Sequence, residues 1–334
     1  MSFPDPKMKE GAEDRTLPRA APKATLSIEW LSGCSGCEVA FADLHEDLPA
    51  VLRDEVELVR IPILMDTKDY VPADVGMITG SIRTEHDVTA AHRMRECCKM
   101  IVALGTCPVY GGPHGGSYAH TTEELLEQAF IRNPTTRTSN LPTGVPGLLE
   151  EDRTLDSEIE VDVYIPGCPP HPAYIIESLR SLLQDREPRI GQYNVCFRCQ
   201  RAMEKTEVDS IRREYEAPSN PNLSDPGLCF LSQGRLCFGS VTLDRCLAPC
   251  PQVGTPCFSC SGPSIPVILE PQKDIRTMVA TTMAHLTKIP EEDIIREIEH
   301  QAKTHYAYAM ASPIFRHKPT FRLREWIKPA KDGT

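Results

Sequence analysis

In the first half of the chain, short apolar runs alternate with segments in which apolar residues recur every three or four positions. The runs have the length of buried strands, and the periodic segments have the spacing of amphipathic helices. Strands that alternate with helices predict an α/β unit with a parallel sheet. The predicted strands are residues 24–31, 56–64, 74–82, 99–105 and 160–165, and the predicted helices are residues 38–52, 85–98, 121–130 and 172–183.

After about residue 188 the pattern changes, because few strands are predicted and cysteines become dense. A polar, proline- and threonine-rich stretch at residues 130–157 precedes this change and predicts a long surface loop. The proline-rich, charged residues 1–22 predict a flexible tail. The helices expected in the second half are residues 204–214, 275–286 and 291–309.

Composition places the chain among soluble globular proteins: 25% of its 334 residues are charged and 40% are hydrophobic. This length predicts a large core and two domains. No apolar run is long enough to span a bilayer, and the first residues carry neither a signal peptide nor a twin-arginine pair. We therefore expect a cytoplasmic protein. The net charge of −11, without a basic stripe, argues against nucleic acid as a partner.

Four cysteines follow predicted strands. Cys34 and Cys37 follow the first strand, Cys107 the fourth and Cys168 the fifth. Sites in parallel α/β sheets form outside the carboxyl ends of the strands, so these thiols are expected to converge at one edge. The glycines and prolines beside them suit a backbone that passes close to a bulky inorganic group.

Eight further cysteines lie in the second half. Cys196 and Cys199 form a C-x-x-C pair, and six more thiols lie in residues 228–263. Four thiolates hold one cubane cluster, so eight suffice for two clusters. They would also suffice for two structural zinc ions. A disulfide framework is a third option, which a reducing compartment disfavours.

The cysteine spacing favours iron–sulfur clusters over zinc. Zinc sites usually pair two C-x-x-C knuckles at near spacing, whereas Cys34 and Cys37 are completed by single, distant cysteines. The segment Cys246-x-x-x-Cys250-Pro251 is similar to the closing part of a bacterial ferredoxin run. Structural zinc remains the alternative.

These residues resemble the small, electron-transferring subunit of nickel–iron hydrogenases. The branch they resemble is the cytoplasmic, methyl-viologen-reducing type, which works with heterodisulfide reductase. The resemblance runs from about residue 24 to beyond residue 263. It is carried by WLSGCSGCEVAFADLHE, ILMDTK, ALGTCPVYGG, PGCPP, NVCFRC and residues 228–263. It implies a flavodoxin-like parallel sheet domain with a proximal cluster at residues 23–187. A loop-rich iron–sulfur domain with two further clusters and C-terminal helices is implied at residues 188–334.

The resemblance also implies the ligands of three [4Fe-4S] clusters. Membrane-linked and periplasmic hydrogenases start their distal set with a histidine where this chain has Cys196. They commonly have proline near Cys250 and a three-iron medial cluster, so this chain agrees with the cytoplasmic branch. The implied ligands are Cys34, Cys37, Cys107 and Cys168 for the proximal cluster, Cys246, Cys250, Cys257 and Cys260 for the medial cluster, and Cys196, Cys199, Cys229 and Cys237 for the distal cluster.

The implied function is a relay of electrons between the NiFe site of a large subunit and an external acceptor. The acceptor is heterodisulfide reductase, a ferredoxin, a flavoprotein or a nicotinamide module. No catalytic residue and no dihydrogen-activating metal are expected on this chain. One alternative is the cluster subunit of a complex-I-like, quinone-linked enzyme, which resembles only the proximal part. The other is a zinc-stabilised interaction protein.

Cys97 and Cys98 fall outside this partition. They lie where a predicted helix meets a predicted strand, and we interpret them as small buried hydrophobic residues. Glu38 is interpreted as a carboxylate in the first turn of a helix. His114, in the glycine-rich loop after Cys107, is expected to stabilise that loop through a hydrogen bond.

Overall fold

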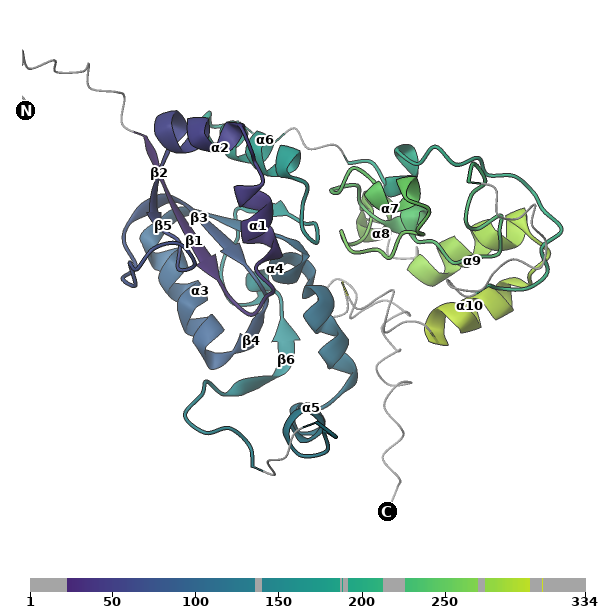
Figure 1. The fold of residues 1–334 in the computed structure, drawn as a ribbon, viewed down its shortest axis with the longest axis horizontal. Helices are drawn as coiled ribbons and strands as arrows, with labels where there is room; N and C mark the ends of the chain where they lie inside the picture. The colour runs from purple at the N-terminus through teal and green to yellow at the C-terminus, as the bar shows by residue number, and fades with distance from the viewer. Residues whose placement is uncertain are drawn as a thin grey trace, which may run out of the picture.

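Five parallel strands form the central sheet in the order β2-β1-β3-β5-β7 (Figure 1). The structure, a computed structural model, describes residues 23–135, 140–186, 188, 192–212, 226–269, 274–300 and 308. Counted within the sheet, the order is 2-1-3-4-5, that of flavodoxin-like doubly wound folds. The predicted parallel α/β fold is therefore confirmed. The strands are β1 Ala24–Trp30, β2 Val56–Arg60, β3 Ala73–Thr79, β5 Cys98–Leu104 and β7 Val163–Ile165.

Helices cover both faces of this sheet, which explains why the apolar residues of β5 follow one another without alternating with polar ones. On one face, Ile78 and Ile101 pack with Met94 of α3 (Glu85–Cys97), and all three are fully buried. On the other face, Met77 and Val102 pack with residues of α1 (Gly36–Ala42) and α6 (Pro172–Leu183). The C-x-x-C motif lies at the turn from β1 into α1, as predicted.

Several predicted boundaries are wrong. The helix expected at residues 38–52 is broken into α1, α2 (Asp47–Ala50) and a π-helical turn (Val51–Glu55). The second strand ends at Arg60. The expected strand 74–82 is interrupted at Gly80, whose φ is +79° because the chain turns against Leu31 and Ser32 there. The chain then continues as β4 (Ile82–Thr84).

The region expected to be a long surface loop contains a strand. β6 (Leu148–Arg153) pairs antiparallel with β4, so the prediction of loop throughout residues 130–157 is wrong. A 3₁₀ turn (Leu155–Ser157) follows β6. The helix expected at residues 121–130 is confirmed as α5 (Thr122–Phe130), which begins with a capping box between Thr121 and Glu124.

The second half is rich in loops, as predicted. Its short elements are η4 (Val195–Phe197), η6 (Gly239–Val241), α7 (Pro249–Gln252) and α8 (Ile265–Leu269). α9 (Ile275–Leu286) and α10 (Glu291–His300) pack against each other. Figure 1 shows these elements on one side of the molecule and the sheet on the other.

The prediction of a helix at residues 204–214 is wrong over the part that the structure describes. Residues 204–212 are not helical: Thr206 donates its backbone N–H to Leu286 O, and Glu204 donates to Ser232 Oγ. The last predicted helix is confirmed as far as His300. The expected tail at residues 1–22 lies outside the described residues, and the domain division near residue 188 stays a prediction. No described helix is both long and apolar enough to cross a bilayer.

Candidate metal centres

The first thiol pair lies just beyond the carboxyl end of β1. Backbone hydrogen bonds between Ser32 and Ser81, 3.2 Å and 2.8 Å long, hold the start of the loop against the chain after β3. Cys34 is exposed, and Cys37 lies in the first turn of α1. Ser35 between them has a φ of +61°, so the chain reverses tightly and both thiols lie on the same small loop.

The next two thiols come from the ends of β5 and β7. Cys107 lies in the short helix α4 (Thr106–Tyr110) that directly follows β5. Cys168 lies after β7 and precedes a cis peptide bond to Pro169. Two backbone hydrogen bonds of 2.8 Å, from Gly105 N to Ile165 O and from Thr106 N to Gly167 O, tie these loops together.

The structure brings these four predicted ligands together. Burial raises the pKa of the Cys37 thiol, and the neighbouring Cys107, Cys168 and Cys34 raise it further because like charges at close range disfavour ionisation. Burial, followed by the effect of Cys34, raises the pKa of Cys168 to about 11. The arrangement follows from the parallel sheet, which places the carboxyl ends of its strands at one edge.

Glycines make room for the sulfur atoms. A Cβ atom on Gly105 would lie 2.4 Å from Cys37 Sγ, and one on Gly112 would lie 2.5 Å from Cys107 Sγ. Gly112 begins the 3₁₀ segment Gly112–Ala119 that follows α4. Both glycines also have positive φ angles, so the backbone and the thiols together require residues without a side chain.

We expect Gly105→Ala to destabilise the fold and to reduce the iron bound at this site. Gly105 has φ 102° and ψ 165°, a region populated almost only by glycine, and the strain costs about 1–3 kcal/mol before the clash with Cys37 is added. Chemical denaturation and iron analysis measure the two effects. Gly144→Ala is the matched control, because Gly144 has a φ of +74° but open space around it. Equal effects of the two substitutions would contradict the role assigned to the sulfur contact.

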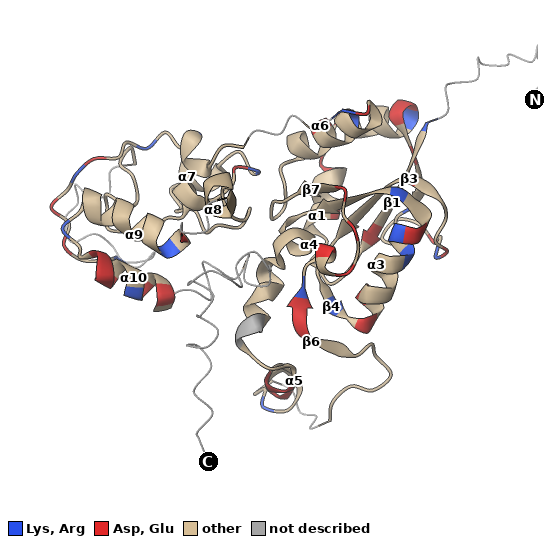
Figure 2. Cartoon of the chain, turned by 180° about the vertical axis from the view of Figure 1, so that it is seen from behind, with Lys and Arg blue, Asp and Glu red and all other residues tan. Residues whose placement is uncertain are grey.

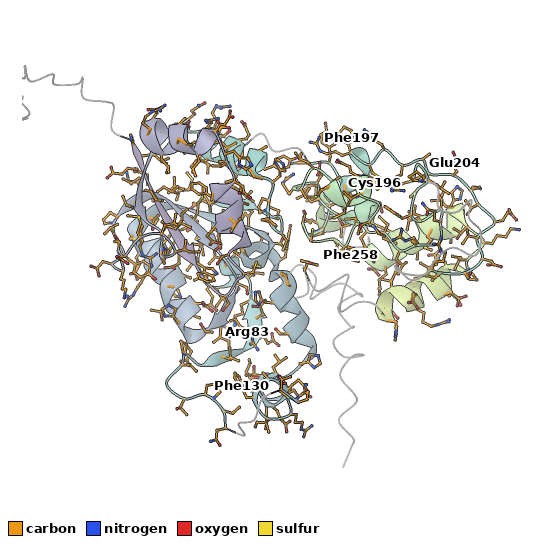
Figure 3. The ribbon with its side chains drawn as sticks, viewed as in Figure 1. Arg83, Phe130, Cys196, Phe197, Glu204 and Phe258 are labelled. Carbon is orange, nitrogen blue, oxygen red and sulfur yellow. The ribbon has the colours of Figure 1, made fainter. Side chains whose placement is uncertain are left out.

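A second group of predicted ligands lies around η4 and the segment after it. Burial raises the pKa of Cys196, and Cys237, Cys229 and Cys199 raise it further. Cys196 and Phe197 both lie in η4, within the loop-rich part that Figure 3 shows apart from the sheet. Phe197 is 64% exposed and stacks on Tyr193 with ring centroids 4.0 Å apart. This thiol group therefore lies beside exposed aromatic surface.

The third group surrounds α7. Burial raises the pKa of Cys260 to about 12, and Cys246, Cys168 and Cys250 raise it further. Burial also raises the pKa of Cys257 well above its usual value, with contributions from Cys237 and Cys260. Figure 2 shows that α7 and α8 themselves carry no acidic or basic residues, whereas the segment just before Cys246 contains buried Asp244, which pairs with Arg198, and buried Arg245.

Two contacts order the three groups along the molecule. Cys260 of the third group lies near Cys168 at the sheet edge, as their electrostatic interaction indicates. At the other end of the third group, the backbone N–H of Cys257 donates a 3.3 Å hydrogen bond to Cys237 Sγ. The group around α7 therefore lies between the group at the sheet edge and the group around η4.

A single zinc ion and a four-iron cluster require different spacings between their thiolate ligands. Among the described residues, no three His, Cys, Asp or Glu side chains lie close enough together to hold one metal ion. Zinc would need its thiolates about 2.3 Å from a common centre. A four-iron cluster is larger, so its cysteines stand farther apart.

Cys97 and Cys98 lie at the opposite edge of the sheet, where α3 ends and β5 begins. Their sulfur atoms are 3.7 Å apart. Burial, followed by the effect of Cys97, raises the pKa of Cys98 to about 12. The structure brings neither residue to the three thiol groups.

Cys97→Ala and Cys98→Ala should leave the iron content unchanged. Cys98 is buried and packed against Gly76, so its replacement should lower the free energy of unfolding by about 1 kcal/mol through the small cavity it leaves. Iron analysis and chemical denaturation of both variants test this. Loss of iron in either variant would mean that the ligand sets are wrongly assigned.

Sequence reasoning missed several residues close to the thiols. The Thr106 hydroxyl donates a 2.7 Å hydrogen bond to Cys260 O. Asp152 is fully buried, accepts a 2.6 Å hydrogen bond from Ser81 Oγ and contributes to the raised pKa of Cys107. Burial, and then the thiols of Cys168 and Cys260, raise the pKa of Tyr308 to about 12. No sequence signal marks Asp152 or Tyr308, whereas Thr106 is marked only by its place beside Cys107.

Two residues interpreted as structural have more specific surroundings. Glu38 does lie in the first turn of α1, but it is buried, and it accepts a hydrogen bond from Thr79 Oγ1. Burial lowers the pKa of His114, and the Arg83 cation lowers it further. The hydrogen bond expected for His114 stays a prediction.

The parallel sheet, with four thiols at its carboxyl edge, defines the chain as a cysteine-rich α/β protein. Comparisons with known proteins identify its relatives. Residues 34–182 match the family described as NADH ubiquinone oxidoreductase, 20 Kd subunit. The chain is 36% identical over 244 residues to a subunit of the F420-non-reducing hydrogenase of Methanococcus voltae, covering 72% of this chain and 83% of the relative. It is 31% identical over 302 residues to a subunit of the F420-non-reducing hydrogenase of Methanothermobacter thermautotrophicus, covering 88% and 96%.

The chain therefore belongs to the same family as these subunits of F420-non-reducing hydrogenases. Among solved structures, an NAD⁺-reducing [NiFe]-hydrogenase in the H₂-reduced state matches with a TM-score of 0.48 and 32% identity, over 51% of this chain and 96% of that one. The match to the 20 Kd family ends at residue 182, before Cys196. The F420-non-reducing hydrogenase relatives cover more of the chain than this family match does.

Proposed function

We propose that this chain is the electron-transferring small subunit of a NiFe hydrogenase and holds three [4Fe-4S] clusters. Cys34, Cys37, Cys107 and Cys168 would hold the proximal cluster, and Cys246, Cys250, Cys257 and Cys260 the medial cluster. Cys196, Cys199, Cys229 and Cys237 would hold the distal cluster. The observation that carries the proposal is the order of three four-thiol groups from the sheet edge to the exposed aromatic surface at Phe197. Membership of the F420-non-reducing hydrogenase family supports it.

The residues around each group fit a cluster. Every proposed ligand is a thiol, the donor that iron–sulfur clusters use. Glycines at positions 105, 112 and 239 lie against Cys37, Cys107 and Cys196, where a Cβ atom would come within 3.1 Å of sulfur. The thiols must lose their protons to bind metal, and bound iron would offset both the burial and the mutual repulsion that raise their pKa values. Such clusters transfer single electrons when they are bound.

The protein contributes position and a low-polarity environment. Cys107, Cys229, Cys237 and Cys257 are buried, so water is largely excluded from their sulfur atoms. Exposure and hydrogen bonds to sulfur set the potential of a cluster, so the potentials would differ between the proximal site, which includes the exposed Cys34, and the distal site, which includes the buried Cys229 and Cys237. The backbone N–H of Cys257 is one such donor, because it bonds to Cys237 Sγ.

We infer that the large subunit binds at the carboxyl edge of the sheet. Cys34 is exposed there, together with Trp30 and Val39 on either side of the loop and Leu64 after β2, which is 73% exposed. We expect an interface in the range of obligate complexes, about 2,000 Å² or more. The acceptor, whether heterodisulfide reductase, a ferredoxin, a flavoprotein or a nicotinamide module, would bind near Phe197. The cytoplasm is the proposed location, because it keeps thiols reduced for metal binding.

Analysis of iron and acid-labile sulfide in anaerobically purified protein tests the proposal. Three four-iron clusters require about twelve iron and twelve sulfide per chain. Iron for a single cluster would instead support a complex-I-like cluster subunit, which needs only the thiols within residues 34–182. Zinc without sulfide would support a zinc-stabilised interaction protein and overturn the proposal.

A further inference from the structure

One buried hydroxyl connects the loops that carry two of the thiol groups. Thr106, the first residue of α4, is 1% exposed and precedes Cys107. Its Oγ1 accepts a 3.0 Å hydrogen bond from Gly167 N, the residue before Cys168. The same Oγ1 donates a 2.7 Å hydrogen bond to the carbonyl oxygen of Cys260. One side chain therefore connects three proposed ligands. Cys107 follows Thr106 in the chain, Cys168 follows its hydrogen-bond donor Gly167, and Cys260 provides its acceptor.

The direction of both hydrogen bonds is fixed by chemistry. A backbone N–H donates only and a carbonyl oxygen accepts only, so the hydroxyl proton must point to Cys260. A continuous path of covalent bonds and two hydrogen bonds thus runs from Cys168 through Gly167 and Thr106 to Cys260. Cys168 and Cys260 are the ligands through which the proximal and medial groups approach each other.

The other end of α4 contacts the same loop. Gly262 has a φ of +80°, and a Cβ atom placed on it would lie 2.3 Å from Cε2 of Tyr110. The ring of Tyr110 therefore packs directly on the Gly262 backbone. With Thr106 on Cys260 and Tyr110 on Gly262, both ends of α4 hold the loop in place, and the spacing between the two thiol groups depends on this helix.

We propose that Thr106 is a positioning residue, whose hydroxyl fixes the spacing between the proximal and medial sites and provides the hydrogen-bonded route for electrons between them. This inference rests on the proposed function for the electron route, whereas the bond to Gly167 stands independently of it. An electron passing along this route leaves one site reduced and the other oxidised, with no bond broken and no proton transferred.

The test compares Thr106→Val, which keeps the shape and removes the hydroxyl, with Thr106→Ser, which keeps the hydroxyl. Hydrogen exchange of the Gly167 amide is measured in the complete complex, because in the Val variant this amide loses the acceptor that it has among the described residues, Thr106 Oγ1. We expect exchange to be about tenfold faster in Thr106→Val, the effect of losing one buried hydrogen bond, and close to the parent rate in Thr106→Ser.

A second measurement follows electrons rather than protons. Rapid freeze-quench after mixing with hydrogen, read by electron paramagnetic resonance, gives the delay between reduction of the proximal and medial sites. We expect a longer delay in Thr106→Val and the parent delay in Thr106→Ser. Tyr174→Phe is the matched control, since it removes a 3.1 Å hydrogen bond from Arg198 between the same two parts of the chain, away from α4. It should change neither measurement.

Unchanged Gly167 exchange in Thr106→Val would overturn the inference, as would an equal delay in the Val, Ser and Phe variants. If Thr106→Val fails to retain iron, Thr106→Ser decides: parent iron content and delay support the role of the hydroxyl, and loss of either overturns it. Failure of the proposed function has a different signature. The parent protein would then lack iron, while the difference in Gly167 exchange between the Val and Ser variants would persist.

Discussion

Cys107→Ala should remove one cluster, about four iron atoms per chain, and abolish hydrogen-dependent viologen reduction in the assembled complex. Cys107 is buried in α4 at the end of β5, and Gly105 and Gly112 shape the backbone around it. No other thiol is placed to replace it, because Cys97 and Cys98 lie at the opposite end of β5. Removing a cluster at the start of the relay interrupts every later step.

Iron and sulfide analysis on anaerobically prepared protein measures the loss, and viologen reduction under hydrogen measures its consequence. Cys98→Ala is the control, since it removes a buried thiol at the start of β5, the end of the strand away from the site. Unchanged iron in Cys107→Ala would contradict the proximal ligand set. Viologen reduction at the parent rate with iron lost would contradict the relay.

The second large effect is expected when the large subunit is left out: this chain by itself should not oxidise hydrogen. Twelve of its fourteen cysteines are assigned to clusters that exchange electrons only. The resemblance to nickel–iron hydrogenases implies that the catalytic metal site requires four thiols on the other subunit. Cys97 and Cys98 are the only unassigned thiols, two fewer than such a site needs.

The experiment expresses the chain alone, loads it with iron and sulfide, and assays viologen reduction under hydrogen. Reduction of the same sample by dithionite, followed by its visible spectrum, is the control that the clusters are present and redox-active. Adding the large subunit should then restore turnover. Robust turnover by the chain alone would overturn the assignment of the catalytic metal to another subunit.

Part of the fold followed from local sequence patterns. Helix α9 was predicted at the residues where it occurs, Ile275–Leu286, and α6 likewise at Pro172–Leu183. The apolar run of β5 predicted a buried strand, because a strand covered on both faces needs no alternation. Placing Cys34, Cys107 and Cys168 at one edge required only the rule that parallel strands share a carboxyl edge.

Predictions failed where distant contacts override local preference. Residues 204–212 have a sequence compatible with a helix, but hydrogen bonds to Ser232 and Leu286 hold the segment in another conformation. β6 was missed because its sequence LLEEDR does not alternate between apolar and polar residues, and the strand exists through its pairing with β4, more than sixty residues earlier. Such pairings are set by the assembled fold and leave little trace in the segment itself.

For this protein, the sequence alone determined the alternation of strands and helices, and with it the edge at which four thiols meet. Hydrophobic periodicity is a local property, so it can be recognised in each segment by itself. Only the tertiary structure decided which groups lie between the thiol sites. The hydrogen bond from Thr106 to Cys260 joins residues 154 positions apart, and no local pattern specifies it. The path between sites therefore depends on how the cysteine-rich loops pack on α4.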